Sequence, residues 1–309
     1  RFWCDHDYIS ENWYHNQVYT PTKLINVLLL MDDLVDPQIK KEALQISHRA
    51  HLNAPGARPG ADRIRIGGIV AKRGLILGDE QAFEESMRLL NDEIKFNTGG
   101  RGMQHDYSFH HRYDRVNTTY SYGGSYADVC AQWAADAAGT KYEFTPEKIE
   151  QLIDYYLDGI CKQAVYGIYL EKGAMNRGIA KKEIFKSIST TTPENLLKSS
   201  HYRESELKEI IALRNGEVEP SASFAKFFWQ SEHFVVQRPD FFTSVRMFSV
   251  RNMNMEYPHN SEGILNHHRG DGTNHLSVTG DEYLNIWPVY DWQKIPGTTV
   301  LQKPALPSE

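Results

Sequence analysis

Residues 205–250, SELKEIIALRNGEVEPSASFAKFFWQSEHFVVQRPDFFTSVRMFSV, decide the fold class because the residue pattern changes within them. Ser205–Leu213 has apolar side chains at helical spacing. Beyond Glu219–Pro220 the sequence continues as short aromatic and β-branched runs, at Ser223–Gln230, His233–Gln237 and Phe242–Val250. We therefore predict an α+β multidomain protein, with a helical domain over residues 1–219 and the start of an antiparallel β domain over residues 220–309.

Helical periodicity recurs through the first two-thirds of the chain. Loops containing Gly, Pro and Asn separate the helical segments, as at Asn53–Gly60 and Asn97–Gly102. Many helices in succession suit an all-α bundle or toroid. The predicted helices are Pro21–Met31, Ile39–His51, Asp62–Leu77, Glu80–Phe96, Tyr126–Ala138, Pro146–Leu170, Pro193–Lys198 and Ser205–Leu213.

The strand pattern continues toward the C-terminus, at Leu276–Val278 and Tyr283–Trp287. About ninety residues of β structure make only part of a sandwich. We expect the Pro-rich residues Lys303–Glu309 to form a loop. The chain starts at Arg1 and shows no signal peptide, so we expect a processed or truncated product.

Charge and composition limit the partners. A formal net charge of −6 argues against nucleic acid, because phosphate binding requires a basic surface. The charge still allows an anionic glycan, which a local basic cleft can attract. No stretch is apolar enough to span a membrane, and the run around Leu28–Met31 is predicted to be a short amphipathic helix. The three cysteines, Cys4, Cys130 and Cys161, have neither disulfide nor metal-ligand spacing.

Reactive side chains concentrate in Gln104–Tyr126, QHDYSFHHRYDRVNTTYSYGGSY. We predict that this Gly-flanked stretch is non-helical. It is too polar for a core and too aromatic for a flexible linker, and loops of this kind commonly carry function. A hydrogen-bonded structural loop is the alternative interpretation.

Two further stretches bring cations and carboxylates. Glu171–Lys182, EKGAMNRGIAKK, is predicted to break a long helix at Asn176-Arg177-Gly178. An Arg at such a break can direct its bidentate guanidinium into a cleft. Arg251–Asn274 places Glu256 near several His residues, but their spacing fits no zinc pattern. We therefore expect neither a metal nor another cofactor.

A fourth stretch, Tyr8–Asn16, precedes the first clear helix with the sequence YISENWYHN. Aromatic rings stack on sugars, and polar neighbours can bind the hydroxyl groups. Aromatic core packing is an almost equally good account. The candidate platform residues are Asn12, Trp13, Tyr14 and Asn16.

Together these stretches resemble polysaccharide lyase family 8, the chondroitin, hyaluronan and xanthan lyases. NWYHNQVYTP is similar to the family's Asn-Trp-Trp patch followed by Pro and a helix. DYSFHH…SYGG is similar to its His-to-Tyr catalytic segment, and NRGIAKK to its Gly-Arg-Gly-Ile-Ser-Arg stretch. The most specific piece, GDGTNHLSVTGDEYLNIWPVYDWQKIPGTT, resembles the family's β-domain signature. The matches keep the family's order from Tyr8 to Thr299.

The resemblance implies an incomplete α/α toroid followed by antiparallel β-sandwich domains. Family members are considerably longer, so it also implies that an N-terminal helical part and later β-sheets are missing here. Its catalytic set is a His, a Tyr, an Arg and a Glu. The Arg corresponds to Arg177 and the Glu to Glu256.

The His and the Tyr of the catalytic set each have two candidates. His111 aligns better than His110. The Tyr-Gly pair selects Tyr122, whereas the spacing from the His selects Tyr120. We favour His111 and Tyr122, and we assign the other two residues to substrate binding.

The implied substrate-binding set contains departures from the family pattern. Lys181 replaces a second Arg, and Asn260 lies one residue further along than the family spacing. Asp62 stands where the family often has an Asn that holds the substrate carboxylate, and an ionised Asp there would repel a uronate. Either Asp62 is protonated, or Asn117 or Asn176 takes that role, or the substrate differs.

These residue types suit β-elimination of a uronate. Removing the C5 proton adds charge to a group that is already anionic, and donors aimed at the carboxylate stabilise that charge. A Tyr beside cations has a lowered pKa, so it can take the proton and return it to the O4 leaving group. A His can act as the base for the opposite C5 epimer or bind the carboxylate while neutral. A Glu orients the Arg or the His.

Two other functions remain open at this point. A glycoside hydrolase would need two facing carboxylates, for which Asp106 or Asp114 with Glu256 are candidates. A non-catalytic glycan-binding protein is the other, because Asp62 and Lys181 depart from the family pattern. We expect a secreted or periplasmic protein whose partner is an anionic polysaccharide. The oligomeric state is open.

Overall fold

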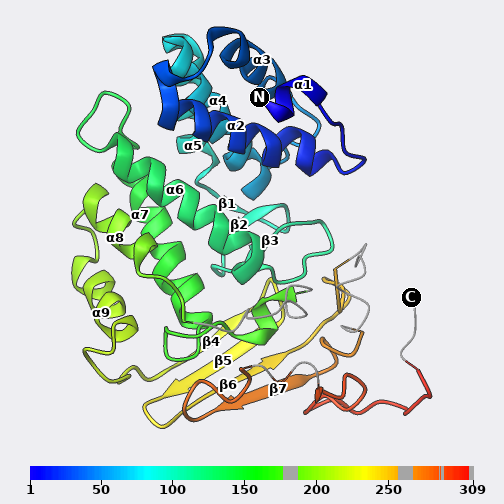
Figure 1. Ribbon diagram of the computed structural model, residues 1–309. Coiled ribbons are helices and arrows are strands. Elements are labelled where there is room, and N and C mark those ends of the chain that lie inside the picture. Colours follow the sequence, from blue (N-terminus) through cyan, green and yellow to red (C-terminus); the bar gives the residue numbers. More distant parts are fainter. Residues whose placement is uncertain (177–186, 257–266, 285, 287–288, 306–309) are drawn as a thin grey trace. The chain divides into compact units, whose positions relative to one another are not determined.

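The computed structural model describes residues 1–176, 187–256, 267–284, 286 and 289–305 (Figure 1). The chain divides into two compact units, with boundaries after Ile94, after Ala135 and after Lys148. Arg1–Ile94 and Asp136–Lys148 form the first, which we call the helical unit. Lys95–Ala135 and Ile149–Glu309 form the second, the mixed unit.

The helical unit packs around one apolar cluster that includes Val18, Ile25 and Ile66, with Trp13 and Tyr14 against it. Side-chain caps mark the starts of two helices. Asp36 accepts hydrogen bonds from the backbone N–H groups of the next helix, and Asp79 does so for another. The elements are α1 (Phe2–His6), the π-helix η1 (His15–Tyr19), α2 (Thr20–Met31), η2 (Asp32–Leu34), α3 (Pro37–Ser47), α4 (Ala61–Leu77) and α5 (Glu80–Glu93).

The helical part of the mixed unit begins with a π-helix, η3 (Thr119–Gly123), which continues directly into α6 (Gly124–Ala137). A second π-helix, η4, follows α7 in the same way. The remaining elements are α7 (Pro146–Asp154), η4 (Tyr155–Cys161), η5 (Lys172–Ala174), α8 (Thr191–Ser199) and α9 (Glu204–Arg214).

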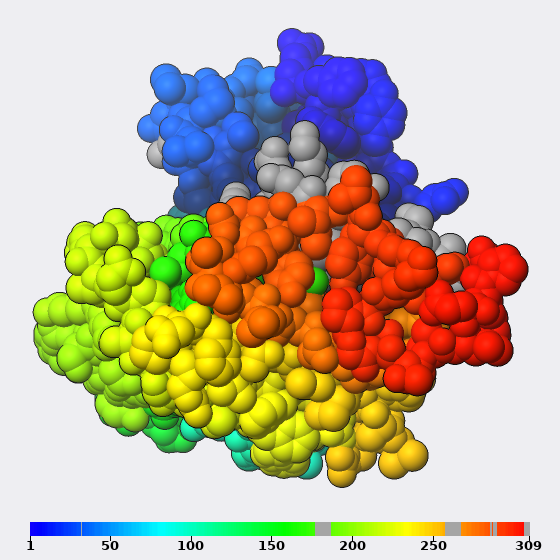
Figure 2. Space-filling model, turned by 90° about the horizontal axis from the view of Figure 1, so that it is seen from below, coloured from blue at the N-terminus to red at the C-terminus, as the bar shows by residue number. Residues whose placement is uncertain are grey.

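Two small sheets complete the mixed unit. Strands β1 (Phe96–Asn97), β2 (Gly102–Gln104) and β3 (Phe109–His110) form one. The other is fully antiparallel in the order β4 (Phe224–Phe228), β5 (His233–Arg238), β6 (Phe241–Arg246) and β7 (Thr273–Ser277). In Figures 1 and 2 the light-green helices α8 and α9 lie beside its yellow strands.

The larger sheet has an unusual buried face. Burial alternates strictly along β5, β6 and β7, as expected of a half-buried strand. The inward positions include apolar residues such as Val235 and Phe242, which pack on Val165 and Tyr166. The others are polar or charged, namely His233, Gln237, Ser244, Arg246, Thr273, His275 and Ser277.

The prediction of an α+β protein, helical first and antiparallel afterwards, is confirmed. The predicted long helix Pro146–Leu170 is wrong, because the helical structure ends near Cys161 and the chain turns at Tyr166 and Gly167, both of positive φ. Asn176 therefore interrupts no long helix. No helix among the described residues is long and apolar enough to cross a membrane.

Two local predictions also need correction. The strand predicted at Tyr283–Trp287 is wrong where it is described, since Glu282–Leu284 form a turn. Glu282 fixes this turn by accepting backbone hydrogen bonds from Val278, Thr279 and Gly280. The stretch Gln104–Tyr126 is not wholly non-helical, because Thr119–Gly123 form the π-helix η3.

Candidate active site

The rings of His111 and Tyr122 stack on each other. Their ring centroids lie 3.3 Å apart and the ring planes differ by 4°. His111 follows strand β3 directly, and Tyr122 lies on the π-helix η3. A π-helical turn displaces side chains from regular helical positions and is frequent at functional sites. The structure thus brings together the two residues that the sequence favoured.

Gly123 explains how the π-helix approaches strand β3. A Cβ on Gly123 would lie 2.8 Å from Cβ of Phe109, and even closer to the hydroxyl of Tyr155. Only a residue without a side chain permits this approach. Phe109 is two residues before His111, so the glycine sets the spacing between the His and the Tyr.

His110 lies inside the protein and makes structural contacts. Its Nε2 is 3.0 Å from Oγ of Ser231, whose hydroxyl donates to Ser108, and Ser108 in turn donates to Asp106. Because both hydroxyl protons are directed toward Asp106, Nε2 of His110 must be the donor to Ser231. Burial, with Arg246 and Arg115 nearby, lowers the pKa of His110 to about 3. A neutral imidazole enclosed in this way is a poor candidate for substrate contact.

Tyr120 is also committed to the protein interior. Its hydroxyl donates to the carbonyl oxygen of Ile160 at 2.6 Å. Burial raises the pKa of this phenol well above its usual value, with the charges of Cys161 and Glu171 adding to the effect. A phenol in that state is unsuited to act as a base. The contrast with Tyr122 favours Tyr122 as the reactive phenol.

Glu256 joins two other segments beside this pair. Its buried carboxylate accepts from Nε of Arg112 at 2.6 Å and from Nδ2 of Asn176 at 2.5 Å. Arg112 follows His111 in the sequence, and Asn176 sits in a left-handed backbone conformation. Glu256 therefore ties the residue after His111 to the segment Glu171–Asn176. Arg177, Lys181 and Asn260 lie outside the described residues.

Asn117 is fully buried and its side chain is completely used. Its Nδ2 donates to Gln163 at 2.7 Å and to Nδ1 of His233 at 3.1 Å. Its Oδ1 accepts from both the backbone and the hydroxyl of Thr119. No donor remains for a substrate carboxylate, so Asn117 has a structural part here.

In the helical unit, Asp62 is buried in the first turn of α4. Its carboxylate lies 2.9 Å from Nη2 of Arg58 and 3.8 Å from Nη1 of Arg65. Two guanidinium groups therefore lie beside this one buried carboxylate.

The predicted platform residues of the helical unit divide into two kinds. Trp13 packs on the core cluster, lies 4.4 Å below the guanidinium of Arg58 and meets Tyr14 edge-on. Asn12 is exposed and accepts from the backbone N–H of Tyr14, whereas both side-chain groups of Asn16 bind the backbone of Ser10. Trp13 thus serves the core and is only partly exposed.

A surface hollow of about 740 Å³ is lined by sequence neighbours of Arg112 and Glu256. Tyr113 follows Arg112, Met255 precedes Glu256, and both line the hollow. Its rim is aromatic and apolar, with Tyr113 77% exposed, Phe248 47% and Met253 52%. Exposed aromatic rings with polar neighbours are suited to binding sugar rings.

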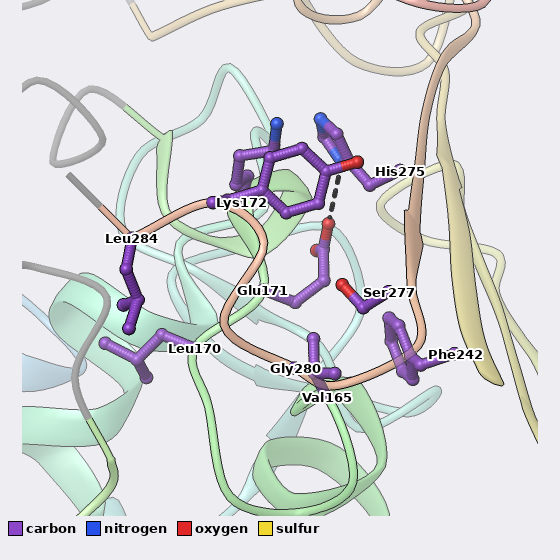
Figure 3. Close-up of a pocket in the computed structure, with 10 residues that line it drawn as sticks. Val165, Leu170, Glu171, Lys172, Phe242, His275, Ser277, Gly280 and Leu284 are labelled. Carbon is purple, nitrogen blue, oxygen red and sulfur yellow. Dashed lines mark hydrogen bonds and ion pairs between the residues drawn. The ribbon is translucent and has the colours of Figure 1, made fainter. Parts of the chain in front are cut away.

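Sequence reasoning missed Arg112 and the residues that line a small cavity beside Glu171. Arg112 had a signal, since it stands directly beside His111. The second group comes from segments far apart in the sequence. Figure 3 shows Glu171 and Ser277 with His275, whose imidazole points to the carboxylate of Glu171. No group of three residues suitable for metal binding occurs in the part of the chain that the structure describes.

The chain folds as helices followed by an antiparallel sheet, and it contains a stacked pair of a His and a Tyr. Residues 1–212 match the polysaccharide lyase family 8 N-terminal alpha-helical domain, and residues 223–309 match the super-sandwich domain of that family. The chain belongs to polysaccharide lyase family 8, as the sequence motifs indicated.

Two curated relatives are similar in sequence. The chondroitinase-AC of Pedobacter heparinus is 27% identical over 303 residues, which cover 97% of this chain and 43% of that protein. The hyaluronate lyase of Thermasporomyces composti is 24% identical over 337 residues, covering 95% and 42%. The chain therefore spans less than half the length of these relatives.

Solved structures agree with this family. A chondroitinase AC lyase studied in oligosaccharide complexes superposes with a TM-score of 0.88 at 26% identity, over 96% of this chain and 44% of that one. The chondroitin AC lyase of Streptomyces coelicolor A3 in complex with chondroitin sulphate has the same fold, with a TM-score of 0.82 at 20% identity over 96% and 47%.

Proposed function

We propose that this protein is a polysaccharide lyase that cleaves glycans of the chondroitin sulfate or hyaluronan kind by β-elimination, leaving a 4,5-unsaturated uronate end. The parallel contact of His111 and Tyr122 at 3.3 Å is the observation that carries the proposal. A phenol and an imidazole side by side support the proposal that both act on one sugar. The names of the similar proteins support the same class of substrate.

In the proposed reaction the phenolate of Tyr122 takes the C5 proton. The electron pair of the C5–H bond moves into the carboxylate, and donors around that group stabilise the enolate-like intermediate. The intermediate then expels O4, which receives its proton from Tyr122 as the C4–C5 double bond forms. One residue can be both base and acid because C5–H and O4 lie on the same face of the ring in one C5 epimer.

His111 has a second part in this proposal. As a neutral imidazole it donates a hydrogen bond to the uronate carboxylate, and with the opposite C5 epimer it acts as the base. Arg177 supplies the positive charge opposite that carboxylate, with Glu256 fixing the neighbouring Asn176 at 2.5 Å. Tyr113 and the hollow beside it offer space for sugars next to the cleaved bond.

The remaining predicted residues enter the proposal in the same way. We place Asn176 among the residues that shape the carboxylate site, and Lys181 and Asn260 among those that bind the glycan. Asn12, Trp13 and Tyr14 form a proposed sugar platform. The proposed domain boundary at residues 219–220 is supported by the two family matches, which leave residues 213–222 between them. Because polymeric glycans of this kind lie outside cells, we propose that the protein is exported.

The hydrolase alternative has less support. Asp106 is buried and accepts hydrogen bonds from the backbone and hydroxyl of Ser108 and from the backbone N–H of Gln230. Both oxygens of Glu256 are bonded as well. Asp114 lines the surface hollow and accepts from the backbone N–H of Val116, but a hydrolase needs two facing carboxylates, and its predicted partner Glu256 has both oxygens bonded to the protein. A glycan-binding protein without turnover is the alternative that activity measurements must separate.

The decisive experiment is incubation of the protein with chondroitin sulfate, hyaluronan, dermatan sulfate and xanthan. Elimination gives products that absorb in the ultraviolet because the new double bond is conjugated with the carboxylate. Saturated reducing ends without this absorbance would indicate a hydrolase. Binding without any product after long incubation would indicate a glycan-binding protein.

A further inference from the structure

The inner face of the larger sheet packs against the buried carboxylate of Glu171. Glu171 lies just before η5, and its Oε1 accepts from Oγ of Ser244 at 2.8 Å. The same oxygen accepts from Nδ1 of His275 at 2.9 Å (Figure 3). Its Oε2 accepts from the backbone N–H of Ala174 at 3.1 Å and lies 3.3 Å from Nε2 of His233. Strands β5, β6 and β7 thus all reach this one group.

On its other side, His233 contacts the segment that carries the reactive pair. Asn117 donates Nδ2–H to Nδ1 of His233 at 3.1 Å. Nδ1 is therefore the acceptor, so a neutral His233 carries its proton on Nε2, which faces Glu171. Asn117 also pairs with His110 across a β-bridge and accepts from Thr119 at the start of η3. The contacts run without a break from the His111–Tyr122 segment through His233 to Glu171.

Gly173 shows how closely the imidazole of His233 and the carboxylate of Glu171 are packed. A Cβ on Gly173 would lie 2.8 Å from Oε2 of Glu171 and 2.9 Å from Nε2 of His233. Real Cβ atoms do not come so close to such atoms, so only glycine fits there. The turn of η5 is built against the Glu171–His233 pair, and Asn176 follows that turn two residues after its end.

We propose that Glu171 and His233 are positioning residues, which hold the His111–Tyr122 segment in register with the segment Glu171–Asn176. The proposal rests on the function proposed above and adds to it a part for two residues that touch no substrate. Asn117, His233 and Glu171 are each at most 2% exposed, so water does not compete for their contacts. A shift at either end of this chain of contacts changes the distance between the imidazole–phenol pair and the Glu256–Asn176 pair.

Hydrogen-bond donors and nearby cations favour the ionised form of Glu171. Burial alone would raise the pKa of this carboxyl, but His233, His275 and the backbone N–H of Gly173 outweigh burial and lower it. Burial lowers the pKa of both imidazoles to about 4. The guanidinium groups of Arg246 and Arg269 and the ammonium of Lys172 also act on this cluster. At neutral pH the cluster is one carboxylate between two neutral imidazoles.

Three substitutions test the chain of contacts at separate points. Glu171→Gln keeps the size of the side chain and removes its charge. His233→Asn retains an acceptor near the position of Nδ1 for Asn117 but loses the ring nitrogen that lies 3.3 Å from Oε2 of Glu171, and His233→Gln does the reverse. Asn195→Ala is the matched control, because Asn195 is a buried residue of the same unit that bonds Gln132 at 3.0 Å and lies outside the chain of contacts.

We expect each test variant to lower kcat by roughly 10- to 100-fold, the range typical of residues that orient a reactive group. KM should stay within about two-fold, because the substrate contacts are unchanged. Combining Glu171→Gln with His233→Asn should add little, since both cut the same link. Fully additive losses of kcat in the double variant would overturn the proposal. So would losses of kcat that are explained by a smaller folded fraction, as any loss in Asn195→Ala would be.

A second measurement needs no activity. In protein labelled with ¹³C-histidine, the stacked ring of Tyr122 should shift the Hε1 resonance of His111 upfield, and His111→Gln assigns that resonance. The three variants should move it toward the position of an unstacked imidazole, and Asn195→Ala should not. An unchanged resonance in all three variants would refute the positioning role. If the wild type makes no unsaturated product from any glycan, the proposed function fails, and this resonance still decides about positioning.

Discussion

Nε of Arg112 donates to Oε1 of Glu256 at 2.6 Å, although 144 residues separate them in the sequence. Glu256 is buried and the side chain of Arg112 is 27% exposed, so the pair lies at the boundary between core and solvent. The contact links the residue after His111 to the residue that the family pattern assigns to catalysis. It makes Arg112 a functional candidate that the motif comparison had not selected.

Arg112→Lys should lower kcat/KM by roughly 10- to 100-fold, because lysine lacks the planar guanidinium and has no N–H at the position of Nε. The measurement is the initial rate of ultraviolet absorbance with chondroitin sulfate or hyaluronan. Arg203→Lys is the matched control, since Arg203 also pairs with a carboxylate, that of Glu206, has a side chain only 18% exposed and does not line the hollow. Equal rates for Arg112→Lys and the wild type would remove Arg112 from the site.

Tyr122→Phe and Tyr120→Phe should behave in opposite ways. Loss of the Tyr122 hydroxyl removes the proposed acid–base group, so kcat should fall by roughly 10²- to 10⁴-fold with little change in stability. Loss of the Tyr120 hydroxyl removes its hydrogen bond to Ile160 and should cost about 1 kcal/mol of folding free energy, with activity retained. The reverse pattern would assign the reactive role to Tyr120.

Lowering the pH from about 6.5 toward 4 should destabilise the protein. The pKa values of His110, His233 and His275 are lowered to about 3, about 4 and about 4 from the usual 6.5. As pH falls from 6.5 toward 4 the unfolded chain binds three protons that the native state does not, so the free energy of unfolding falls. The full slope is about 4 kcal/mol per pH unit for three groups.

Urea unfolding at pH 7, 6 and 5 measures this slope. The variant His233→Asn should reduce it by about one-third, because one of the three proton differences disappears. The lowered pKa of Glu171 acts in the same direction, but only below the usual range of a glutamate. A free energy of unfolding that stays constant from pH 7 to pH 5 would contradict the prediction.

Asp62→Asn should show whether Asp62 mainly compensates the charge of Arg58 and Arg65 or also repels an anionic glycan. The substitution removes the carboxylate that pairs with Arg58 and Arg65 and leaves both guanidinium groups in place. We expect a lower thermal stability and a lower KM for an anionic glycan, because the local charge becomes more positive. Asp36→Asn is a suitable control, since Asp36 caps a helix elsewhere in the same unit. An unchanged KM would show that Asp62 does not act on substrate binding.

Tyr113→Ala should weaken glycan binding with little effect on the chemical step. Tyr113 is 77% exposed and lines the hollow beside Arg112, so its loss should raise KM several-fold and leave stability unchanged. Trp229→Ala removes another exposed aromatic residue, on the turn after β4, and should leave KM as it is. A fall in kcat instead of a rise in KM would place Tyr113 closer to the reacting atoms.

Periodicity and motifs in the sequence determined the order of helices and strands and the family. Apolar spacing predicted α4 and α9 to within a residue or two, because local patterns dictate which face of an amphipathic element is buried. The motifs also selected His111 and Tyr122 over their neighbours. The π-helical turn that carries Tyr122 escaped prediction, since it depends on Gly123 packing against Phe109 and Tyr155.

Only the tertiary structure decided which polar residues face inward and touch one another. His233, Ser244 and His275 lie on separate strands, and nothing in their sequence spacing reveals that they converge on Glu171. The pairing of Arg112 with Glu256 likewise depends on long-range packing. Local sequence fixes the alternation of a strand, but the register between strands and the partner of a buried charge come from the whole fold, because a buried charge is stable only beside its partners.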